Sequence, residues 1–139
     1  MLVRPLARRT GMVPRVLIVE DDGGLRSLLD QRLHLEGFAP ISVPNGREAL
    51  QLLKGGVRVS VILLDLIMPV MDGWTFRREQ LADPALAHIP VIAVSGANDL
   101  RAQQLDAAAL FRKPVPIEQL VRCIHHICDA PTTDAPILT

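Results

Sequence analysis

The stretch Val59-Ser-Val-Ile-Leu-Leu-Asp65 decides the fold of this chain, because it is a short apolar run that ends in a carboxylate. Apart from Ser60, the residues before Asp65 are aliphatic, which is typical of a strand buried on both faces of a parallel sheet. Pro69 and Gly73 follow soon after and end the regular structure. Ligands bind beyond the carboxyl ends of strands in open parallel sheets, so this pattern places Asp65 at a candidate functional site.

Four further apolar runs alternate with helical patterns along the chain. The other predicted strands are residues 15–19, 38–43, 91–94 and 109–112. Apolar side chains recur at helical spacing within residues 25–33, 49–53, 74–81, 98–106 and 117–127. Five strands alternating with five helices predict a doubly wound α/β fold, in which helices cover both faces of a parallel sheet. Pro40 cannot donate a hydrogen bond to a neighbouring strand, so its strand is expected at an edge of the sheet.

The composition favours one folded domain of ordinary size. The chain has 139 residues, 49% of them hydrophobic, which is enough for a domain with its own core. Its 15 basic and 15 acidic side chains cancel, so we expect no general attraction to nucleic acid. No apolar run approaches the roughly 20 residues that cross a membrane, and we expect a cytoplasmic protein without membrane insertion.

The predicted domain organisation is an N-terminal tail at residues 1–14, a folded domain at 15–128 and a C-terminal tail at 129–139. The sequence leaves open whether translation starts at Met1 or Met12. Because the C-terminal tail is too short to fold alone, no second domain is expected in this chain.

Polar side chains stand at the ends of four predicted strands. The first strand is followed by Glu20, Asp21 and Asp22, the third ends in Asp65, and the fourth and fifth are followed by Ser95 and Lys113. Since the carboxyl ends of parallel strands meet at one edge, we expect carboxylates, a hydroxyl and an ammonium to converge. Clustered carboxylates repel one another, and their hard oxygen atoms suit Mg²⁺ completed by a phosphate. The pattern predicts phosphoryl transfer to a carboxylate nucleophile.

Four motifs, in this order, resemble the signature of two-component response-regulator receiver domains. They are Val-Glu20-Asp21-Asp22, Asp65-x-x-Met-Pro-x-Met-Asp-Gly73, Ser95-Gly96 and Lys113-Pro114. The resemblance runs from about Arg15 to Cys128. It implies a flavodoxin-like (βα)5 fold with the sheet order 2-1-3-4-5, which again places the strand with Pro40 at an edge.

The resemblance also implies a role for each motif. Asp65 would accept a phosphoryl group from the phosphohistidine of a histidine kinase or a histidine phosphotransfer protein. Mg²⁺ would be held by Asp21, Asp65 and the backbone carbonyl of Ile67, with Glu20 acting through a metal-bound water. The bound phosphate would also be contacted by Ser95 and Lys113.

Signal output is implied to depend on the last part of the domain. Family members usually carry an aromatic switch residue three positions before the lysine, where this chain has Leu110, with Phe111 beside it. The face that phosphorylation would reshape includes Leu100, Leu110 and Phe111, together with exposed positions of the last helix.

Three functions from different classes fit these observations. The leading interpretation is a stand-alone response regulator that is not an enzyme and signals through a downstream protein, without direct contact to nucleic acid. A second is a phosphorylation-independent adaptor of the same fold, which the non-aromatic Leu110 favours and the complete set of motifs opposes. A third is a phosphohydrolase with an aspartyl-phosphate intermediate. Such enzymes need a general acid, often an Asp two positions past the nucleophile, and here that position is Ile67.

Overall fold

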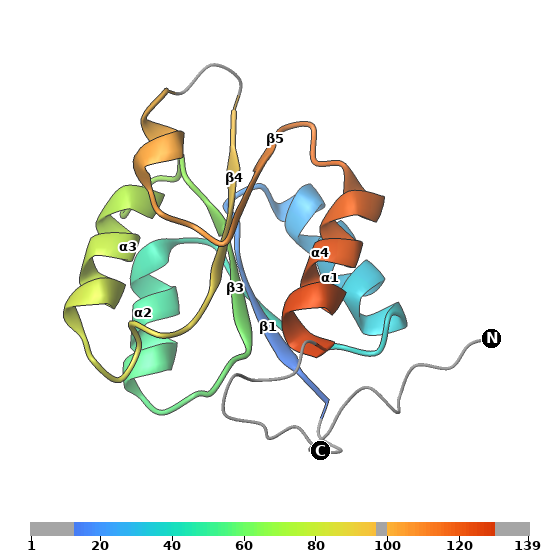
Figure 1. The fold of residues 1–139 in the computed structure, drawn as a ribbon, viewed down its shortest axis with the longest axis horizontal. Coiled ribbons are helices and arrows are strands. Elements are labelled where there is room, and N and C mark those ends of the chain that lie inside the picture. Colours follow the sequence, from blue (N-terminus) through green and yellow to red (C-terminus); the bar gives the residue numbers. More distant parts are fainter. Residues whose placement is uncertain (1–12, 97–99, 130–139) are drawn as a thin grey trace, which may run out of the picture.

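A five-stranded parallel sheet lies at the centre of the protein (Figure 1). The computed structural model describes residues 13–96 and 100–129, without the side chain of Leu100. The strands are β1 (Arg15–Val19), β2 (Ala39–Val43), β3 (Val61–Asp65), β4 (Val91–Ser95) and β5 (Ala109–Arg112). They lie in the order β2-β1-β3-β4-β5 with every neighbouring pair parallel, which confirms the predicted sheet. The strand that contains Pro40 lies at an edge, as expected.

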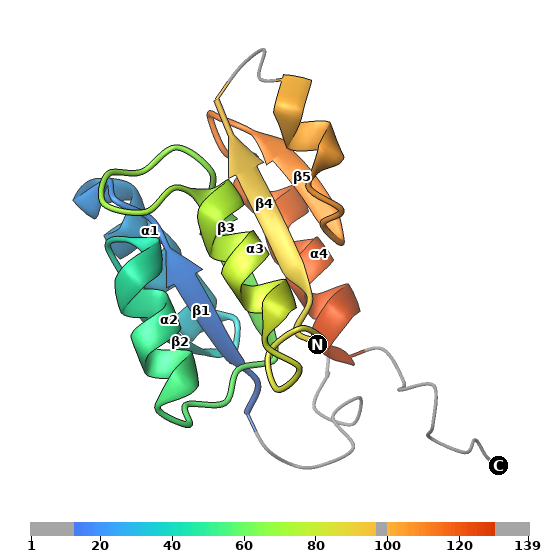
Figure 2. The ribbon, with the colours of Figure 1, turned by 90° about the vertical axis from the view of Figure 1, so that its left-hand side faces the viewer.

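Helices cover both faces of this sheet. They are α1 (Gly23–Leu35), α2 (Gly46–Lys54), α3 (Gly73–Ala82) and α4 (Ile117–Asp129). In Figure 2, α2 and α3 lie in front of the sheet, and α1 and α4 lie behind it. Alternate residues of each strand therefore enter different cores: Leu17 and Val19 pack in the core with α2 and α3, and Val16 and Ile18 pack in the core with α1 and α4.

The central strand β3 is buried along its whole length. It lies between β1 and β4, with Ile62 and Leu64 in one core and Val61 and Leu63 in the other. Because both faces are covered by helices, an apolar side chain is favourable at every position of this strand. The same burial extends to Asp65 at its end, which is only 2% exposed.

The connection between β4 and β5 contains a 3-10 helix within residues 98–106, where the sequence predicted a short helix. Leu100–Gln104 form a 3-10 helix, η2, and residues 97–99 lie outside the described part of the chain. Ala102 and Leu105 are buried and stand three positions apart, which suits a helix with three residues per turn. Residues 13–96 and 100–129 therefore contain four α-helices instead of the expected five.

The η2 segment is held against α3 at both of its ends. The indole N–H of Trp74 donates to the carbonyl of Arg101 at 3.4 Å, and the Arg101 guanidinium lies 4.2 Å from the centre of the Trp74 ring. Arg77 donates from Nη2 to the carbonyl of Asp106 at 2.9 Å. Asp106 has a positive φ of 61°, a value at which the 3-10 helix cannot continue. These contacts between side chains of α3 and backbone carbonyls hold the segment in place although it forms only a short 3-10 helix.

Side chains at the N-termini of α2 and α3 cap these helices. Asn45 Oδ1 accepts a hydrogen bond from the Glu48 N–H at 2.9 Å, and Asp72 Oδ1 accepts one from the Thr75 N–H at 2.8 Å. In the described segments no helix has both the length and the hydropathy needed to cross a membrane. Most of the predicted tails lies outside these segments, so the domain boundaries stay predictions.

Candidate functional site

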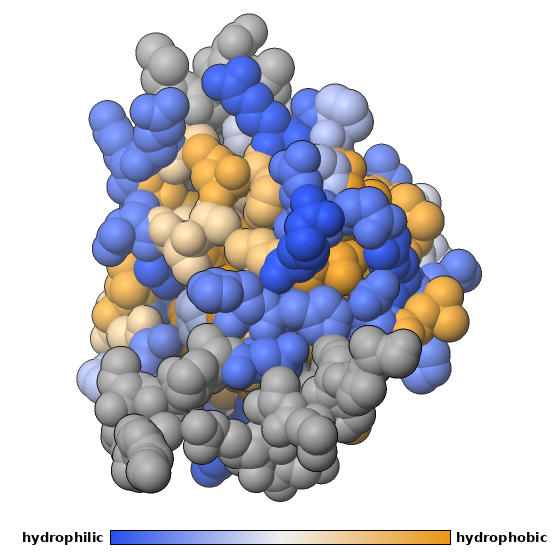
Figure 3. Space-filling view, turned by 45° about the vertical axis from the view of Figure 1, so that its right-hand side comes forward, coloured by the Kyte–Doolittle hydropathy of each residue, from blue (hydrophilic) through white to orange (hydrophobic). Residues whose placement is uncertain are grey.

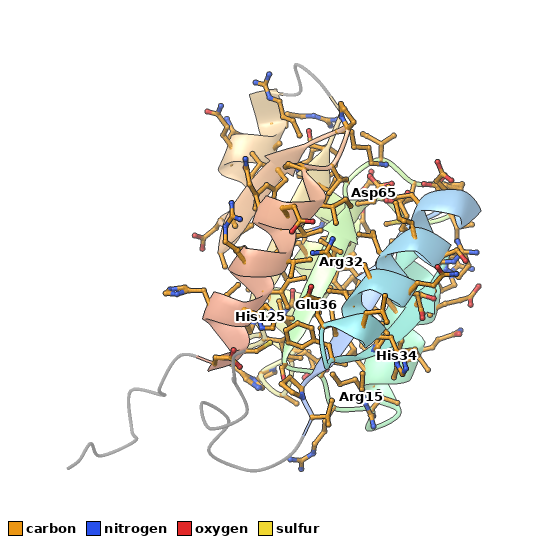
Figure 4. The ribbon with its side chains drawn as sticks, turned by 90° about the vertical axis from the view of Figure 1, so that its right-hand side faces the viewer. Arg15, Arg32, His34, Glu36, Asp65 and His125 are labelled. Atoms are coloured by element: carbon orange, nitrogen blue, oxygen red, sulfur yellow. The ribbon has the colours of Figure 1, made fainter. Side chains whose placement is uncertain are left out.

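Side chains from three strand ends meet at the carboxyl edge of the sheet. Asp65 ends β3, Glu20 follows β1 and Lys113 follows β5. Lys113 Nζ lies 3.2 Å from Asp65 Oδ2 and 3.3 Å from Glu20 Oε2. Both carboxylates are buried, at 2% and 3% exposure, so one ammonium faces two acidic groups inside the protein. Figure 4 shows Asp65 at this end of the sheet, far along the strands from Arg15 at the start of β1.

An exposed third carboxylate, Asp21, completes an acidic cluster. One oxygen each from Glu20, Asp21 and Asp65 lies within 4.8 Å of the others. A set of hard oxygen atoms at this separation suits a small divalent cation that keeps several waters. The charges point the same way, because three carboxylates outnumber the single Lys113 ammonium. These residues therefore could hold a metal ion, and the exposed position of Asp21 leaves the cluster open to solvent.

The buried charges shift the protonation of the site. Burial, followed by repulsion from Glu20, raises the pKa of Asp65 to about 7, against the attraction of Lys113. Burial also disfavours the charged form of Lys113, but attraction to Asp65 and Glu20 outweighs it and raises the pKa of the ammonium. Lys113 thus stays charged, whereas Asp65 without a further cation is partly protonated at neutral pH. The ionised carboxylate is the nucleophilic form, and additional positive charge at the site would favour it.

The backbone after β1 holds Glu20 in place. The N–H of Asp22 donates to Glu20 Oε2 at 3.1 Å, and Arg26 Nη1 donates to the Glu20 carbonyl at 2.7 Å. Asp22 caps α1 by accepting from the N–H groups of Gly24 and Leu25. Asp22 thus acts as a helix cap, and Arg26 is a positioning residue that no sequence motif indicated.

The first residue of α3, Gly73, lies in close contact with the backbone of Asp65 and Leu66. The Gly73 N–H donates to the Leu66 carbonyl at 2.8 Å. A Cβ atom at position 73 would lie 2.7 Å from Leu66 Cα and 2.9 Å from the Asp65 carbonyl oxygen. Contacts this short with backbone atoms cannot be relieved by a rotamer change. The structure therefore requires glycine here, and the glycine fixes the end of β3 against the start of α3.

The loop between Asp65 and Gly73 presents two apolar side chains to solvent. Ile67 is 56% exposed, and its N–H donates to Asp65 Oδ1 at 3.3 Å. Val70 is 63% exposed and has a φ of 71°, a strained value for a β-branched residue. A tight turn accompanies it, in which the Met71 N–H donates to the Pro69 carbonyl at 2.7 Å. The loop places Ile67 next to the cluster. That the backbone carbonyl of Ile67 binds a metal stays a prediction.

Ser95 lies at the same edge of the sheet, and its hydroxyl is bonded to the backbone of the next residue. It ends β4 and is buried, and its Oγ donates to the Gly96 carbonyl at 2.7 Å. The Lys113 N–H donates to the Ser95 carbonyl at 2.8 Å, which ties the ends of β4 and β5 together. The structure thus brings Ser95 to the edge that carries Asp65 and Lys113, and its contact with a phosphate stays a prediction.

The predicted output residues lie on β5 and η2. Leu110 is 38% exposed, whereas Phe111 is partly buried against the core with α1 and α4. Leu100 begins η2, and its side chain falls outside the described part of the structure. Figure 3 shows the face that carries β5, α4 and α1, where orange hydrophobic side chains are visible between blue hydrophilic ones.

A second charge cluster, which we call the α1–α4 clasp, lies away from this site. Arg32 of α1 donates from Nη1 and Nη2 to the two carboxylate oxygens of Glu118 of α4, each at 2.8 Å. Glu36, the C-cap of α1, lies 3.1 Å from Arg32 Nε and 3.0 Å from Nε2 of His125 in α4. Figure 4 shows Arg32, Glu36 and His125 between the two helices. The clasp joins residues far apart in the sequence, and no spacing in the sequence indicates it.

Comparisons with known proteins agree on one family. The chain matches the family model described as response regulator receiver domain over residues 16–125. It is 35% identical to the C4-dicarboxylate transport transcriptional regulatory protein DctD of Rhizobium meliloti, over 78% of this chain and 24% of DctD. It is 31% identical to the response regulator PleD of Caulobacter vibrioides, over 73% of this chain and 25% of PleD. The chain thus spans about a quarter of the length of these two relatives.

A solved structure matches the fold over almost its whole length. The signal receiver domain of a signal transduction histidine kinase from Syntrophus aciditrophicus superposes with a TM-score of 0.80 and 28% identity, covering 91% of this chain and 98% of that domain. The family model covers residues that include β1 to β5 and the cluster of Asp65, Glu20 and Lys113. The chain therefore belongs to the family of response regulator receiver domains, which act in two-component signalling with histidine kinases.

Proposed function

We propose that Asp65 accepts a phosphoryl group from the phosphohistidine of a histidine kinase or a histidine phosphotransfer protein. The observation that carries this proposal is the convergence of buried Asp65 and Glu20 on Lys113 at the carboxyl edge of the sheet. In the transfer, an oxygen of Asp65 forms a bond to phosphorus while the bond from phosphorus to the histidine nitrogen breaks. The electron pair of that bond stays on the imidazole, and the product is an acyl phosphate on Asp65.

The proposal includes Mg²⁺ held by Asp21, Asp65 and the carbonyl of Ile67, with Glu20 contributing through a water. Mg²⁺ supplies the positive charge that ionises Asp65 and balances the phosphoryl oxygens. Lys113 Nζ, already 3.2 Å from Asp65 Oδ2, is within reach of a phosphoryl group on that carboxylate. The chain would serve as a phosphoacceptor that assists its own modification, and not as an enzyme with an external substrate.

The output would be a contact with a downstream protein. We propose that the Ser95 hydroxyl leaves the Gly96 carbonyl and donates to the phosphoryl group, which pulls on the end of β4. The face formed by η2, β5 and α4 is the nearest surface to this change, because β5 pairs with β4 and the Lys113 N–H is bonded to the Ser95 carbonyl. Leu110 is the exposed apolar side chain on β5 that such a partner would contact.

The test is phosphorylation of the full chain by a small-molecule phosphodonor, read by intact mass with and without Mg²⁺. We expect one phosphoryl adduct that requires Mg²⁺ and is absent in Asp65→Asn. Asp72→Asn is the matched control, because it makes the same change in the same loop and asparagine still caps α3. A beryllofluoride titration keeps a short-lived adduct from being missed. A folded protein that forms neither complex would contradict the proposal.

The same variants separate the two alternative functions. If Asp65→Asn bound the downstream protein as tightly as the phosphorylated native chain, a phosphorylation-independent adaptor would be the correct reading. If the native chain released phosphate repeatedly from a small phosphate ester, the phosphohydrolase would be the correct interpretation. We expect neither result, since Ile67 at the place of the general acid carries no titratable group.

A further inference from the structure

A pocket lies at the end of the sheet opposite to Asp65, where β3 and β4 begin. It is formed by the end of α2 with its following loop, residues 53–59, and by the loop after α3, residues 85–89. Figure 2 shows these two segments at the same end of the molecule, below α2 and α3. The cavity measures about 430 Å³, within the range of roughly 300–1,000 Å³ that is usual for small-molecule sites. Nothing in the phosphoacceptor chemistry uses it.

The inside of this pocket is apolar. Its aliphatic lining consists of Leu53, Val57, Val59, Leu86 and Ile89. Leu53, Leu86 and Ile89 belong to the core with α2 and α3, so the floor of the pocket is continuous with the packed interior. An apolar group placed there would lose its contact with water wherever it touches these aliphatic side chains. Removing apolar surface from water favours binding.

The wall after α3 is held in shape by a buried polar network. Gln80 is completely buried, and its Nε2 donates to the carbonyls of Leu86 at 2.9 Å and Ile89 at 3.0 Å. Its Oε1 accepts from Arg77 Nη1 at 2.8 Å. Two backbone carbonyls of the loop are thus fixed from inside the protein. A pocket wall fixed in this way needs no ordering when a ligand binds.

The mouth of the pocket is positively charged. Arg58 and His88 line the pocket and are both exposed, so they mark the place where it meets solvent. Within residues 13–96 and 100–129, neither side chain forms a hydrogen bond or an ion pair. None of the described residues that line the pocket is acidic. The guanidinium of Arg58 is therefore available for a planar anion, with the imidazole of His88 as a second donor.

We propose that this pocket binds a small amphipathic carboxylate, with the apolar body on the aliphatic floor and the carboxylate at Arg58 and His88. A carboxylate fits because the only charged or titratable groups in the lining are cationic or basic, and the apolar floor excludes a highly charged ligand. The pocket shares no residue with the acidic cluster, so its ligand and a phosphoryl group would not compete for the same side chains.

The test is a titration of the full, isotopically labelled chain with sodium hexanoate, followed by the backbone amide signals in NMR spectra. We expect saturable shifts at Gly56, Val57 and Ala85. Affinity should rise from butanoate to hexanoate by up to about fourfold for each methylene buried. Hexanoate should bind more tightly than 1-hexanol or hexylamine, because only the carboxylate complements the mouth. Equal affinity for the three head groups, or shifts spread over the whole protein, would overturn the proposal.

Variants at the mouth locate the carboxylate. Arg58→Gln and His88→Gln should each weaken hexanoate binding about threefold and leave 1-hexanol binding unchanged. Arg47→Gln is the control, because Arg47 is an exposed arginine in the first turn of α2, and Arg58 lies in the loop after the other end of that helix. Ala85→Phe should fill the pocket and abolish the shifts for all three compounds. Hexanoate binding that survives Ala85→Phe in a folded protein would place the ligand elsewhere and refute the site.

Discussion

At the carboxyl edge of the sheet one ammonium faces two buried carboxylates, whereas in the α1–α4 clasp basic and acidic side chains alternate at partly or fully exposed positions. The first group has an excess of negative charge: the pKa of Asp65 is raised to about 7, mainly by burial and then by Glu20. In the clasp the shifts favour the charged forms. A hydrogen bond from His125 is the main cause that lowers the pKa of Glu36, and the Arg32 guanidinium lowers that of Glu118.

This difference separates a binding site from a structural contact. The clasp satisfies its charges internally, and its geometry is complete without a ligand. The cluster around Asp65 is kept in place by the backbone and by Arg26, although its carboxylates repel one another. Negative charges left unbalanced inside a fold favour the binding of a cation, so this cluster has the electrostatics of a cation site.

The largest expected effect comes from removing the charge of Asp65. Because its pKa is raised, the folded protein binds more protons than the unfolded chain between about pH 4 and pH 7, so stability falls as pH rises through this window. Asp65→Asn removes that loss and should stabilise the metal-free protein by about 2 kcal/mol at pH 8, and hardly at all at pH 4. Urea unfolding at both pH values measures this. A destabilised variant at pH 8 would contradict the comparison.

The second effect is stabilisation by Mg²⁺. At ten times its dissociation constant, a ligand that binds only the folded protein adds about 1.4 kcal/mol, so Mg²⁺ should raise the Tm and EDTA should reverse the rise. Asp21→Asn should abolish this increase with little change in the metal-free Tm, since Asp21 is exposed. Asp22→Asn serves as the control, because it caps α1 and asparagine preserves the cap. An equal Mg²⁺ response in both variants would mean that the cluster is not the metal site.

The third effect should have the opposite pH dependence and arise from Glu36. Its pKa is lowered in the folded protein, so its contribution is present above the ordinary pKa near 4.3 and is lost as pH falls through the lower, folded value. Glu36→Gln should therefore lower the Tm by about 1–3 °C at pH 7, and by less at pH 3. Thermal unfolding at the two pH values tests this, with Glu79→Gln on the exposed side of α3 as the control.

The smallest effect should come from the ion pair between Arg32 and Glu118. Glu118 is solvent-exposed, so water and salt screen this contact even though both hydrogen bonds are short. In a double-mutant cycle of Arg32→Gln and Glu118→Gln, the coupling should appear as a Tm change of no more than about 1 °C that disappears in 1 M salt. Coupling that survives high salt would show that the clasp is more than a screened surface contact.

Local patterns in the sequence were sufficient to predict the sheet and most of the site. The apolar run at 59–65, the acids after the first strand and Lys113 after the last each depend on residues close together in the chain. In a parallel sheet the positions of strand ends follow from the strand order, so the convergence of Asp65, Glu20 and Lys113 could be predicted without coordinates. The edge position of the strand with Pro40 followed from one missing N–H group.

Contacts between distant residues could not be predicted in this way. Arg32 and Glu118 are 86 positions apart, and Glu36 and His125 are 89 apart, so no local spacing connects them. The type of the short helix predicted within 98–106 could not be predicted for the same reason. Its shape depends on Trp74 and Arg77 of α3, which bind the carbonyls of Arg101 and Asp106. The helical spacing of apolar residues in that segment did not distinguish a 3-10 helix from an α-helix.

The glycine that starts α3 has a consequence for how this protein can diversify. Because position 73 admits no side chain, the end of β3 with Asp65 and the first turn of α3 keep a fixed position relative to each other. The outward side chains of Ile67 and Val70 lie in the same loop and touch little of the protein, at 56% and 63% exposure. Paralogues could therefore acquire new partner preferences by changing these two exposed positions, while the Asp65 carboxylate keeps its geometry. Crosstalk between related signalling pathways could be reduced by mutations at these positions alone, without altering the chemistry of the site.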